Sequence, residues 1–553
     1  MAGIAPAVRI VDNPRGRKPN VMPRSSIQPW YVAVLALALV LLSHWLQNGT
    51  GLDFCDEGYL WYGAVQTSAG HVPIRDFRSY DPGRYYWVSA TSHIFGQGIL
   101  GLRKSTALFQ MVGLLCGLLA LTRVIRNHTG LALAGVCLTL WMFPHYKIFE
   151  SSISMMAVFL AVRLLEHPSR GRFLAAGMFV GAAAFFGRNL GLYCFLAFVS
   201  LITFMRIRFR PEGLPGGVGI WLAGVILGYS PMLVMALGVP RFWGSFVESV
   251  VFLYTRGGLN SPLPVPWPWT LDCGTWSSGL AREASIAASF LLIPLFLGIS
   301  LGILFFSRRW RVERHPLLPA STFVALFYCH HAFSRADLSH LAESMAPLLL
   351  GLVALTQFIE GRRAARIACA AALIAATLPA GLAGSMAFHR LRAPEGVFVR
   401  TRLAEDTIWV LSWQAEAIES MRRLVREHVS PGESLLIAPQ EPALYCILKR
   451  ECPVWDPMPA WPHTEGKQQQ MMDRLERSKT QWVLISNARS GDHDHRRFQD
   501  MQVFLWTYLT REFAPVPWPG LKPDQILLHR KDPGKPGWTG SLPDDGSQRT
   551  AES

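Results

Sequence analysis

Two adjacent carboxylates, Asp56 and Glu57, follow the first apolar segment of the chain and are its most reactive-looking feature. They open a polar stretch, 47–100, that is rich in Tyr, Trp and Arg. A carboxylate of ordinary or slightly raised pKa can take a proton from an attacking hydroxyl group. The structural alternative is that Asp56 acts as the N-cap of a helix over 58–69.

Three arginines and two further aspartates lie close together in this stretch, between residues 75 and 84. They are Arg75, Asp76, Arg78, Asp81 and Arg84. A guanidinium fork grips phosphate oxygens in a bidentate manner, so these arginines are candidate ligands for a phosphate group. The structural alternative is pairing of the arginines with the neighbouring aspartates, which is as well supported for Arg75 and Arg78.

Other charged residues stand at the ends of later apolar segments. Glu150 follows Pro144-His-Tyr-Lys-Ile-Phe, and Arg188 lies between two apolar runs with almost no loop. Arg335, Asp337 and His340 form another polar island. An arginine next to a bilayer needs an anionic partner, which is either another side chain or a substrate.

A metal site is a second interpretation of that island. His330, His331, Asp337 and His340 are ligand types, but their spacing fits no established zinc pattern. We expect no cofactor, and the need for a divalent metal ion stays open.

The composition indicates a membrane protein with several spans. Of the 553 residues, 50% are hydrophobic and 16% are charged, and the mean hydropathy is +0.24. These values exclude an ordinary soluble globular protein. The net charge of +15 does not indicate a nucleic-acid partner, because the basic residues lie in short clusters between apolar runs.

Eleven apolar runs are long enough to be predicted as spans. They are about 30–45, 101–122, 130–146, 152–166, 171–187, 190–205, 217–239, 285–306, 316–333, 344–360 and 365–387. The run 84–100 is expected to lie along the membrane surface, because only then do the arginine clusters gather on the cytoplasmic side. This topology places the N-terminus inside. The outer face then receives the carboxylates, a long loop at 240–284 and the C-terminal region.

The regions outside the spans differ in character. Residues 1–28 form a basic tail without an apparent cleavage site, 29–388 form the membrane domain, and 531–553 is expected to be disordered. In 389–530, short apolar strands at 434–438, 481–486 and 525–529 alternate with helical patterns at about 403–428, 467–478 and 497–511, which predicts a small α/β domain. Within it, Cys446 and Cys452 are either a disulfide or two free thiols.

Taken together, these features resemble the GT-C superfamily of membrane glycosyltransferases, in its bacterial branch of aminoarabinose and protein-mannose transferases. The resemblance covers roughly 29–390 and is carried by Asp56-Glu57-Gly-Tyr, Gly70-His-Val-Pro-Ile-Arg-Asp-Phe77 and Asp81-Pro-Gly-Arg-Tyr-Tyr86. It implies a mainly α polytopic fold of about 11 transmembrane helices with an outer α/β domain, in the bacterial cytoplasmic (inner) membrane. A Lys-Pro-Pro stretch found in some members reads Asp81-Pro-Gly-Arg84 here, and Asn189 stands where an acid is half expected.

The resemblance also implies an activity. A sugar would pass from a polyprenyl-phosphate donor to a lipid, glycan or protein acceptor at the outer face, with inversion. Asp56 matches the family's first-loop aspartate and would orient or deprotonate the acceptor, and Glu150 falls where a second acid is often kept. Arg84, Arg188 and Arg335 would stabilise the departing phosphate. The alternatives are a lipid-linked glycan transporter or flippase, and a protein resembling O-antigen ligases.

Overall fold

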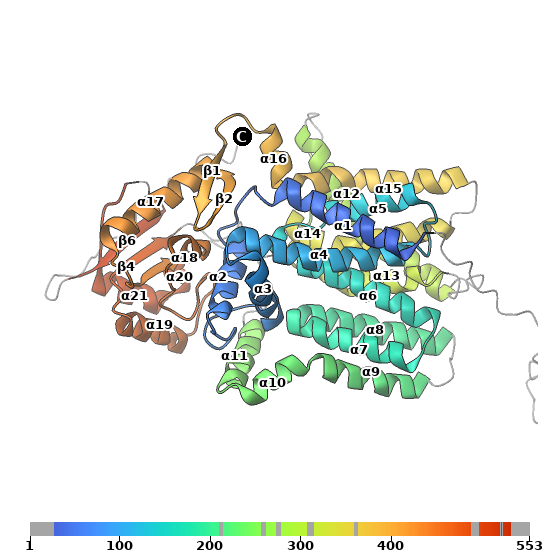
Figure 1. Cartoon of the computed structure of the whole chain (residues 1–553), viewed down its shortest axis with the longest axis horizontal. Helices are drawn as coiled ribbons and strands as arrows, with labels where there is room; N and C mark the ends of the chain where they lie inside the picture. Colours follow the sequence, from blue (N-terminus) through green and yellow to red (C-terminus); the bar gives the residue numbers. More distant parts are fainter. Residues whose placement is uncertain are drawn as a thin grey trace, which may run out of the picture.

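A computed structural model describes residues 27–208, 214–255, 262–272, 278–306, 315–358, 363–487, 497–519, 521–522 and 524–531. Within these ranges the chain forms a body of roughly parallel and antiparallel helices and a mixed α/β unit packed at one end of it (Figure 1). The basic tail up to residue 26, most of the tail from 531 and the arginines at 307–314 lie outside the described residues.

The helical body follows the apolar runs of the sequence. Its helices are α1 (Pro29–Gln47), α4 (Ile99–Leu121), α5 (His128–Leu140), α6 (Ile148–Glu166), α7 (Arg170–Phe186), α8 (Arg188–Arg208), α9 (Leu214–Gly228), α10 (Ser230–Gly238), α12 (Ser278–Phe306), α13 (Leu317–Ser334), α14 (Leu338–Leu355) and α15 (Arg363–Ala383). Six segments among the described residues are long and apolar enough to cross a membrane, or seven if α9 and α10 form one span bent by 50°. The total of eleven spans stays a prediction.

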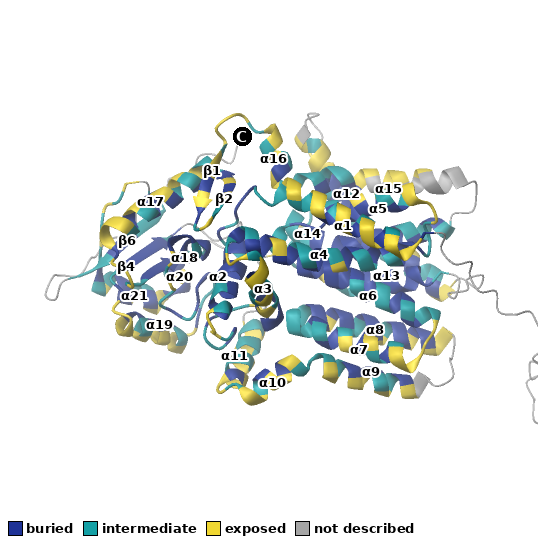
Figure 2. Ribbon diagram, viewed as in Figure 1, coloured by how far each residue is buried: buried dark blue, intermediate teal, exposed yellow. Residues whose placement is uncertain are grey.

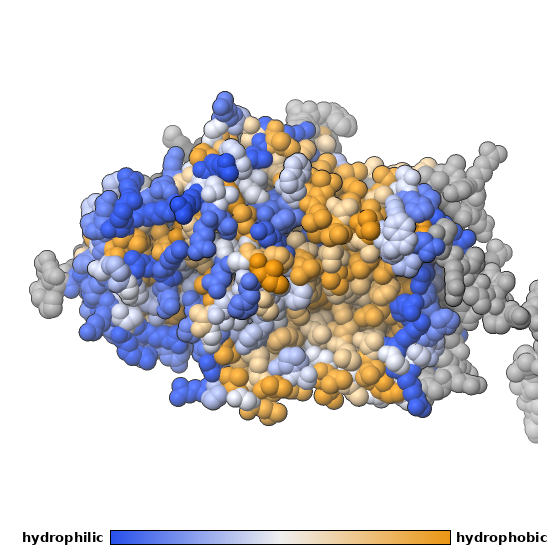
Figure 3. All heavy atoms as spheres, viewed as in Figure 1, coloured by the Kyte–Doolittle hydropathy of each residue, from blue (hydrophilic) through white to orange (hydrophobic). Residues whose placement is uncertain are grey.

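The surface of the body agrees with a membrane location. Apolar side chains form a broad band over the helices, and hydrophilic side chains cover both ends of this band (Figure 3). At the end far from the α/β unit, Arg123 pairs with Glu166, and Arg172 donates to the carbonyl of Arg163. Arginines therefore gather at that end, as the predicted topology requires.

Two short helices cover the other end. They are α2 (Asp56–Ser68) and α3 (Pro82–Phe95). Helix α3 has 14 residues, which is too short for a span. The indole of Trp87 donates to the carbonyl of Ser105 at 2.9 Å, and the indole of Trp61 donates to the carbonyl of Gln97 at 2.8 Å. The run 84–100 accordingly packs against the end of α4 and is not among the candidate spans.

The region expected to be a long loop contains a helix. Helix α11 (Phe242–Thr255) follows α10. The described chain also has short 3-10 turns, which are η1 (His145–Lys147), η2 (Pro268–Thr270) and η4 (Thr356–Phe358). Helix α11 is not among the candidate spans, so the placement of 240–284 as an outer connection between spans stays a prediction. The aromatic residues of α11 stack, with Phe242 and Phe246 rings 6.4 Å apart, which gives the segment a local reason to fold.

The C-terminal unit has two sheets. Strands β1 (Phe398–Leu403) and β2 (Asp406–Leu411) form a hairpin, and β3 (Leu435–Ala438), β4 (Trp482–Ser486), β5 (Phe513–Pro515) and β6 (Gln525–Arg530) form a mixed sheet in the order β3-β4-β6-β5. The accompanying helices are α16 (Met386–Arg392), α17 (Ser412–His428), α18 (Ala443–Leu448), α19 (Glu465–Arg477), α20 (Phe498–Met501) and α21 (Val503–Glu512). The three predicted strands are present. The helix predicted from 403 begins only at Ser412, because 406–411 pairs as strand β2 with β1.

The α/β unit and the helical body share a hydrophobic core. Helix α2 packs on α18, where the amide of Ala443 donates to the carbonyl of Phe54 at 3.1 Å. Buried residues of one continuous cluster run from Phe149 in α6 through Leu60 in α2 to Leu444 in α18. Buried residues accordingly continue from the helices into the sheet (Figure 2). Cys446 and Cys452 are free thiols in this unit.

Candidate functional site

Asp56 begins helix α2, but it does not cap the helix as the sequence suggested. The carboxylate of Asp53 accepts hydrogen bonds from the amides of Cys55 and Asp56, at 2.7 and 3.1 Å. Asp53 thus satisfies backbone donors at the start of the helix. The carboxylate of Asp56 is left available for other partners.

The carboxylate of Asp56 is half-buried and weakly held. Its one side-chain hydrogen bond among the described residues is a long contact of 3.5 Å, donated by the hydroxyl of Tyr80. The rings of Tyr59 and Tyr80 meet edge to face with centroids 5.0 Å apart, and so form an aromatic wall beside it. Of the acids that the sequence singled out, Asp56 alone has no ion pair in the described part of the chain.

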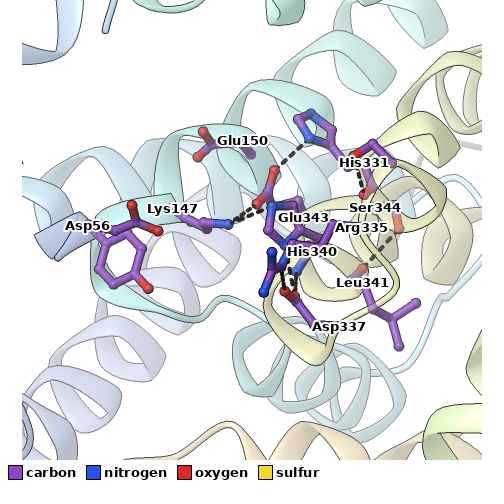
Figure 4. A network of polar contacts seen from close by, with 12 residues as sticks. Asp56, Lys147, Glu150, His331, Arg335, Asp337, His340, Leu341, Glu343 and Ser344 are labelled. Atoms are coloured by element: carbon purple, nitrogen blue, oxygen red, sulfur yellow. Dashed lines mark hydrogen bonds and ion pairs between the residues drawn. The ribbon is translucent and has the colours of Figure 1, made fainter. Parts of the chain in front are cut away.

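Lys147, at the end of η1, is the cation next to Asp56. Its ammonium contacts Glu343 at 2.8 Å and the Nε2 atom of His340 at 3.3 Å. Figure 4 shows Asp56 on one side of Lys147 and the Glu343–His340 pair on the other. An ammonium has three donors, so Lys147 can still donate toward Asp56 or toward a ligand between them.

A second cationic group lies at the start of α14. Asp337 accepts a hydrogen bond from the amide of His340 at 2.9 Å, contacts the His340 ring at 2.8 Å, and accepts from the Nε of Arg335 at 2.7 Å. Burial alone would raise the pKa of Asp337, but these bonds hold that pKa well below its usual range. The Nη groups of Arg335 make no hydrogen bond within the described residues, so Arg335 keeps donors free for a ligand.

Deeper in the body, Glu150 and Arg84 form a buried pair. Arg84 contacts the Oε1 atom of Glu150 at 2.7 Å and donates from Nε to the carbonyl of Phe186 at 2.8 Å. Within the described residues, the other oxygen of Glu150 is buried and has no hydrogen-bond partner. The same holds for Nε2 of His331, whose Nδ1 contacts Glu343 at 2.6 Å. Arg84 and Glu150 are therefore brought together, although Glu150 does not face Asp56 as a second free acid.

Arg188 is neutralised by Asp81. The Nε of Arg188 donates to Asp81 at 3.0 Å, its backbone amide donates to the same carboxylate at 2.7 Å, and its Nη1 donates to Ser249 of α11 at 3.0 Å. The carboxylate explains how an arginine is tolerated between α7 and α8, where the sequence leaves no loop.

Glu57 has a different environment from its neighbour Asp56. It is only 2% exposed and accepts from the Nε and Nη2 of Arg103, both at 2.8 Å. Arg103 also donates to the carbonyls of Asn48 and Gly51. Burial would raise the pKa of Glu57, but Arg103 outweighs burial and lowers it. The carboxylate of Glu57 thus neutralises Arg103 in this buried position.

Arg75 and Arg78 lie away from this cluster. Arg75 pairs with the adjacent Asp76 at 2.7 Å near the surface. Arg78 reaches into the C-terminal unit and contacts Asp456 at 2.7 Å, and His463 contacts the same carboxylate at 2.7 Å. Arg75 thus pairs with a neighbouring aspartate, as the structural alternative describes, whereas Arg78 pairs with an aspartate of the C-terminal unit and not with a neighbour.

No group of three or more His, Cys, Asp or Glu side chains within the described residues is arranged to hold a metal ion. Of the four residues considered for a metal, His331 faces Glu343, His340 faces Asp337, and His330 contacts the hydroxyl of Tyr193 at 2.7 Å. The histidines are thus divided among separate partners.

Sequence reasoning missed three residues of the cluster: Lys147, Glu343 and Asp53. Glu343 had a signal, because it is a carboxylate inside an apolar segment of membrane length, and such residues are usually functional or paired. The signal for Lys147 was weaker, namely its place three residues before Glu150. The only signal for the role of Asp53 as the acceptor at the start of α2 was its distance of three residues from Asp56.

Comparisons with known proteins give structural likenesses. No model of a protein family matches the chain, and no curated protein matches it. Among solved structures, the chain is similar to ArnT from Cupriavidus metallidurans bound to undecaprenyl phosphate, with 13% identity, a TM-score of 0.47, and coverage of 90% of this chain and 97% of that one. It is also similar to ArnT from the same organism in the apo state, with 14% identity, a TM-score of 0.42 and the same coverage.

Proposed function

We propose that the chain transfers a sugar from a polyprenyl-phosphate donor to a lipid, glycan or protein acceptor, at the membrane face that carries Asp56. The observation that carries the proposal is the placement of one uncommitted carboxylate, Asp56, beside a group of hydrogen-bond donors formed by Lys147, His340 and Arg335. These residues come from three separate segments of the chain and meet where the helical body joins the α/β unit. The predicted topology makes this the outer face.

In this proposal Asp56 acts on the acceptor. A half-buried carboxylate with one long hydrogen bond can accept a proton from an acceptor hydroxyl as the hydroxyl oxygen attacks the anomeric carbon. The bond from the anomeric carbon to the phosphate oxygen breaks as the new one forms. A single displacement of this kind inverts the configuration of the anomeric carbon.

The cations act on the leaving group. The phosphate of the donor gains negative charge as the sugar departs, and preorganised donors that face this charge lower the barrier. Lys147 and Arg335 have donors left after their contacts with Glu343 and Asp337, and His340 lies between the two. Arg84 and Arg188 are more fully engaged, with Glu150 and Asp81, and we assign them to shaping the site. Glu57, Arg75 and Arg78 have structural partners and receive no role in the reaction.

A transporter of lipid-linked glycans is the second candidate, and one observation favours it. Helices α9 and α10 are bent by 50° at their break; if they form one span, that span is interrupted, as is typical of transporters. The break is next to Tyr229, which lies close enough to Asp81 and Arg188 to interact with them electrostatically. The charged residues of the main cluster, however, gather at the helix ends and not at the middle of the spans.

Release of the lipid phosphate separates the two functions. Purified protein in proteoliposomes would receive a panel of polyprenyl-phosphate sugars labelled in the lipid, with and without membrane extract as the source of acceptor. A transferase releases free polyprenyl phosphate only with acceptor, whereas a transporter leaves the donor intact.

The role of Asp56 is tested by Asp56→Asn. We expect at least a hundredfold loss of transfer, because general-base catalysis commonly contributes that much. Asp473→Asn, on the exposed face of α19, is the matched control and should transfer normally. Wild-type transfer by Asp56→Asn would refute the assignment of Asp56 as the base.

A further inference from the structure

A cavity of about 480 Å³ lies in the C-terminal unit, between β1, α17 and the end of α18. Five of its lining residues are cationic: Arg402, Arg422, Arg426, Lys449 and Arg450. So many like charges around one cavity repel one another unless an anion is present. No step proposed for Asp56 uses any of these residues.

Two of the five cations already have carboxylate partners. Arg422 contacts Glu419 at 2.5 Å, and Lys449 contacts Glu405 at 3.4 Å. The other three have no ion pair within the described part of the chain. Arg402 donates to the carbonyl of Ala404, and Arg426 makes no side-chain hydrogen bond there. The cavity therefore keeps a surplus of positive charge.

Arg450 supplies a further sign of a missing partner. Its Nη2 donates to the carbonyl of Val429 at 3.1 Å, but its Nε is buried and has no hydrogen-bond acceptor in the portion of the chain that the structure describes. A buried donor without a partner is costly, and a bound acceptor such as a phosphate oxygen would remove that cost.

The rest of the lining is apolar. The wall is completed by Ala404, Val425, Val429, Pro431, Ile447 and Leu448. Val429 and Ile447 are each only 4% exposed. An arginine rim over an aliphatic floor suits a ligand with an anionic group and an adjoining hydrocarbon part.

The neighbouring hairpin places the cavity near the membrane end of the helices. The amide of Leu100, at the start of α4, donates to Asp406 in the β1–β2 turn at 2.9 Å. The carbonyl of Gly49, after α1, accepts from the amide of Trp409 at 2.8 Å. Trp409 and Val399 are 36% and 39% exposed on this hairpin, and Arg390 lies over the Trp409 ring. Exposed Trp, Val and Arg side chains are typical of a membrane interface.

We propose that this cavity binds the phosphate group of an anionic membrane lipid, with the arginines around the phosphate and the aliphatic floor beneath its glycerol and first methylenes. Such a site would tie the C-terminal unit to the bilayer surface, independently of the reaction at Asp56. Free phosphate carries the same recognised group, and the experiment distinguishes the two sources.

The test uses the purified full-length chain in detergent, titrated with phosphatidylglycerol and, separately, with phosphatidylcholine, while native mass spectrometry counts bound lipids. The pocket variant is Arg402→Gln/Arg426→Gln, which changes two exposed side chains. The control is Arg400→Gln/Arg423→Gln, with the same loss of charge on the same strand and helix but outside the lining.

We expect phosphatidylglycerol to bind the wild type at least tenfold more tightly than phosphatidylcholine does. The affinity for phosphatidylglycerol should fall at least tenfold in the pocket variant and less than twofold in the control. If inorganic phosphate at similar concentration displaced phosphatidylglycerol, the cavity would still be a phosphate site, but its ligand would be free phosphate and not the lipid. Equal binding of both lipids, or equal affinity of the pocket variant and the control, would overturn the proposal. Asp56→Asn should bind phosphatidylglycerol normally, so this test and that of the transferase can fail independently.

Discussion

Glu57→Gln tests whether the two adjacent carboxylates of α2 have separate roles. In the structure, Glu57 accepts from both Nε and Nη2 of Arg103 inside a nearly closed environment. A glutamine can accept from only one of these donors, because its other terminal atom is an NH₂ group. The variant therefore loses one charge-assisted hydrogen bond and leaves the charge of Arg103 without a counter-charge.

The expected cost follows from these two losses. Breaking one partner of a buried ion pair typically lowers the free energy of unfolding by about 3–5 kcal/mol. The control is Glu166→Gln, which makes the same change at the more exposed pair with Arg123 and should cost about 1 kcal/mol or less. Because the pKa of Glu57 is lowered, its contribution is complete above the ordinary carboxyl range and is lost only as the pH falls, so a measurement at pH 7 captures it fully.

The assay measures the apparent unfolding midpoint in detergent. It is applied to a double-mutant cycle of Glu57→Gln, Arg103→Met and the double variant. We expect a coupling energy of at least about 2 kcal/mol, since removing both charges avoids the uncompensated arginine. Additive effects within about 0.5 kcal/mol would refute the pairing. The pairing would also be refuted if Glu57→Gln were as stable as Glu166→Gln but transferred no sugar, because Glu57 would then act on a substrate.

Two further predictions concern the surroundings of Asp56. Burial, and then the charge of Asp56, raise the pKa of Asp53 to about 6, so wild-type stability should fall as the pH rises from about 4 through 6. Asp53→Asn keeps an acceptor for the amides of Cys55 and Asp56 and should flatten this stability profile; a step near pH 6 that persists in the variant would contradict the prediction. At Gly58 an added Cβ would lie 2.4 Å from the amide nitrogen of Ala443, so Gly58→Ala should cost about 1–3 kcal/mol and speed proteolysis of the C-terminal unit. Gly466→Ala, which meets no atom within 4 Å, is the control, and equal proteolysis of the two variants would show that α2 and α18 are not tightly packed.

The parts of the fold that the sequence predicts are those set by local pattern. Each apolar run overlaps a helix, although 217–239 is divided between α9 and α10 and 130–146 extends past the end of α5. Three strands of the C-terminal sheet lie where short β-branched and aliphatic runs occur. The exclusion of 84–100 from the spans depended on the positions of the arginines, which can also be read directly from the sequence. Strand β2 was missed because its pairing with β1 overrides the helical pattern of 403–411.

The site was less predictable because its contacts join residues far apart in sequence. The sequence indicates that Arg78 needs an anion, but not that the anion is Asp456 of another unit. It equally cannot show that Glu57 belongs to Arg103 whereas Asp56 remains uncommitted, since the two acids are neighbours on one helix turn. Ion pairing of this kind is decided by packing, and one residue of difference along α2 changes the direction in which a side chain points.

The junction between the α/β unit and the helices has a bearing on how the protein matures. Arg78, on the loop between α2 and α3, pairs with Asp456, and the carbonyl of Phe54, just before α2, accepts from the amide of Ala443 in α18. The segment carrying Asp56 is synthesised hundreds of residues before those partners. These contacts therefore form late, after the last helix has been inserted and the C-terminal chain has folded back over the first.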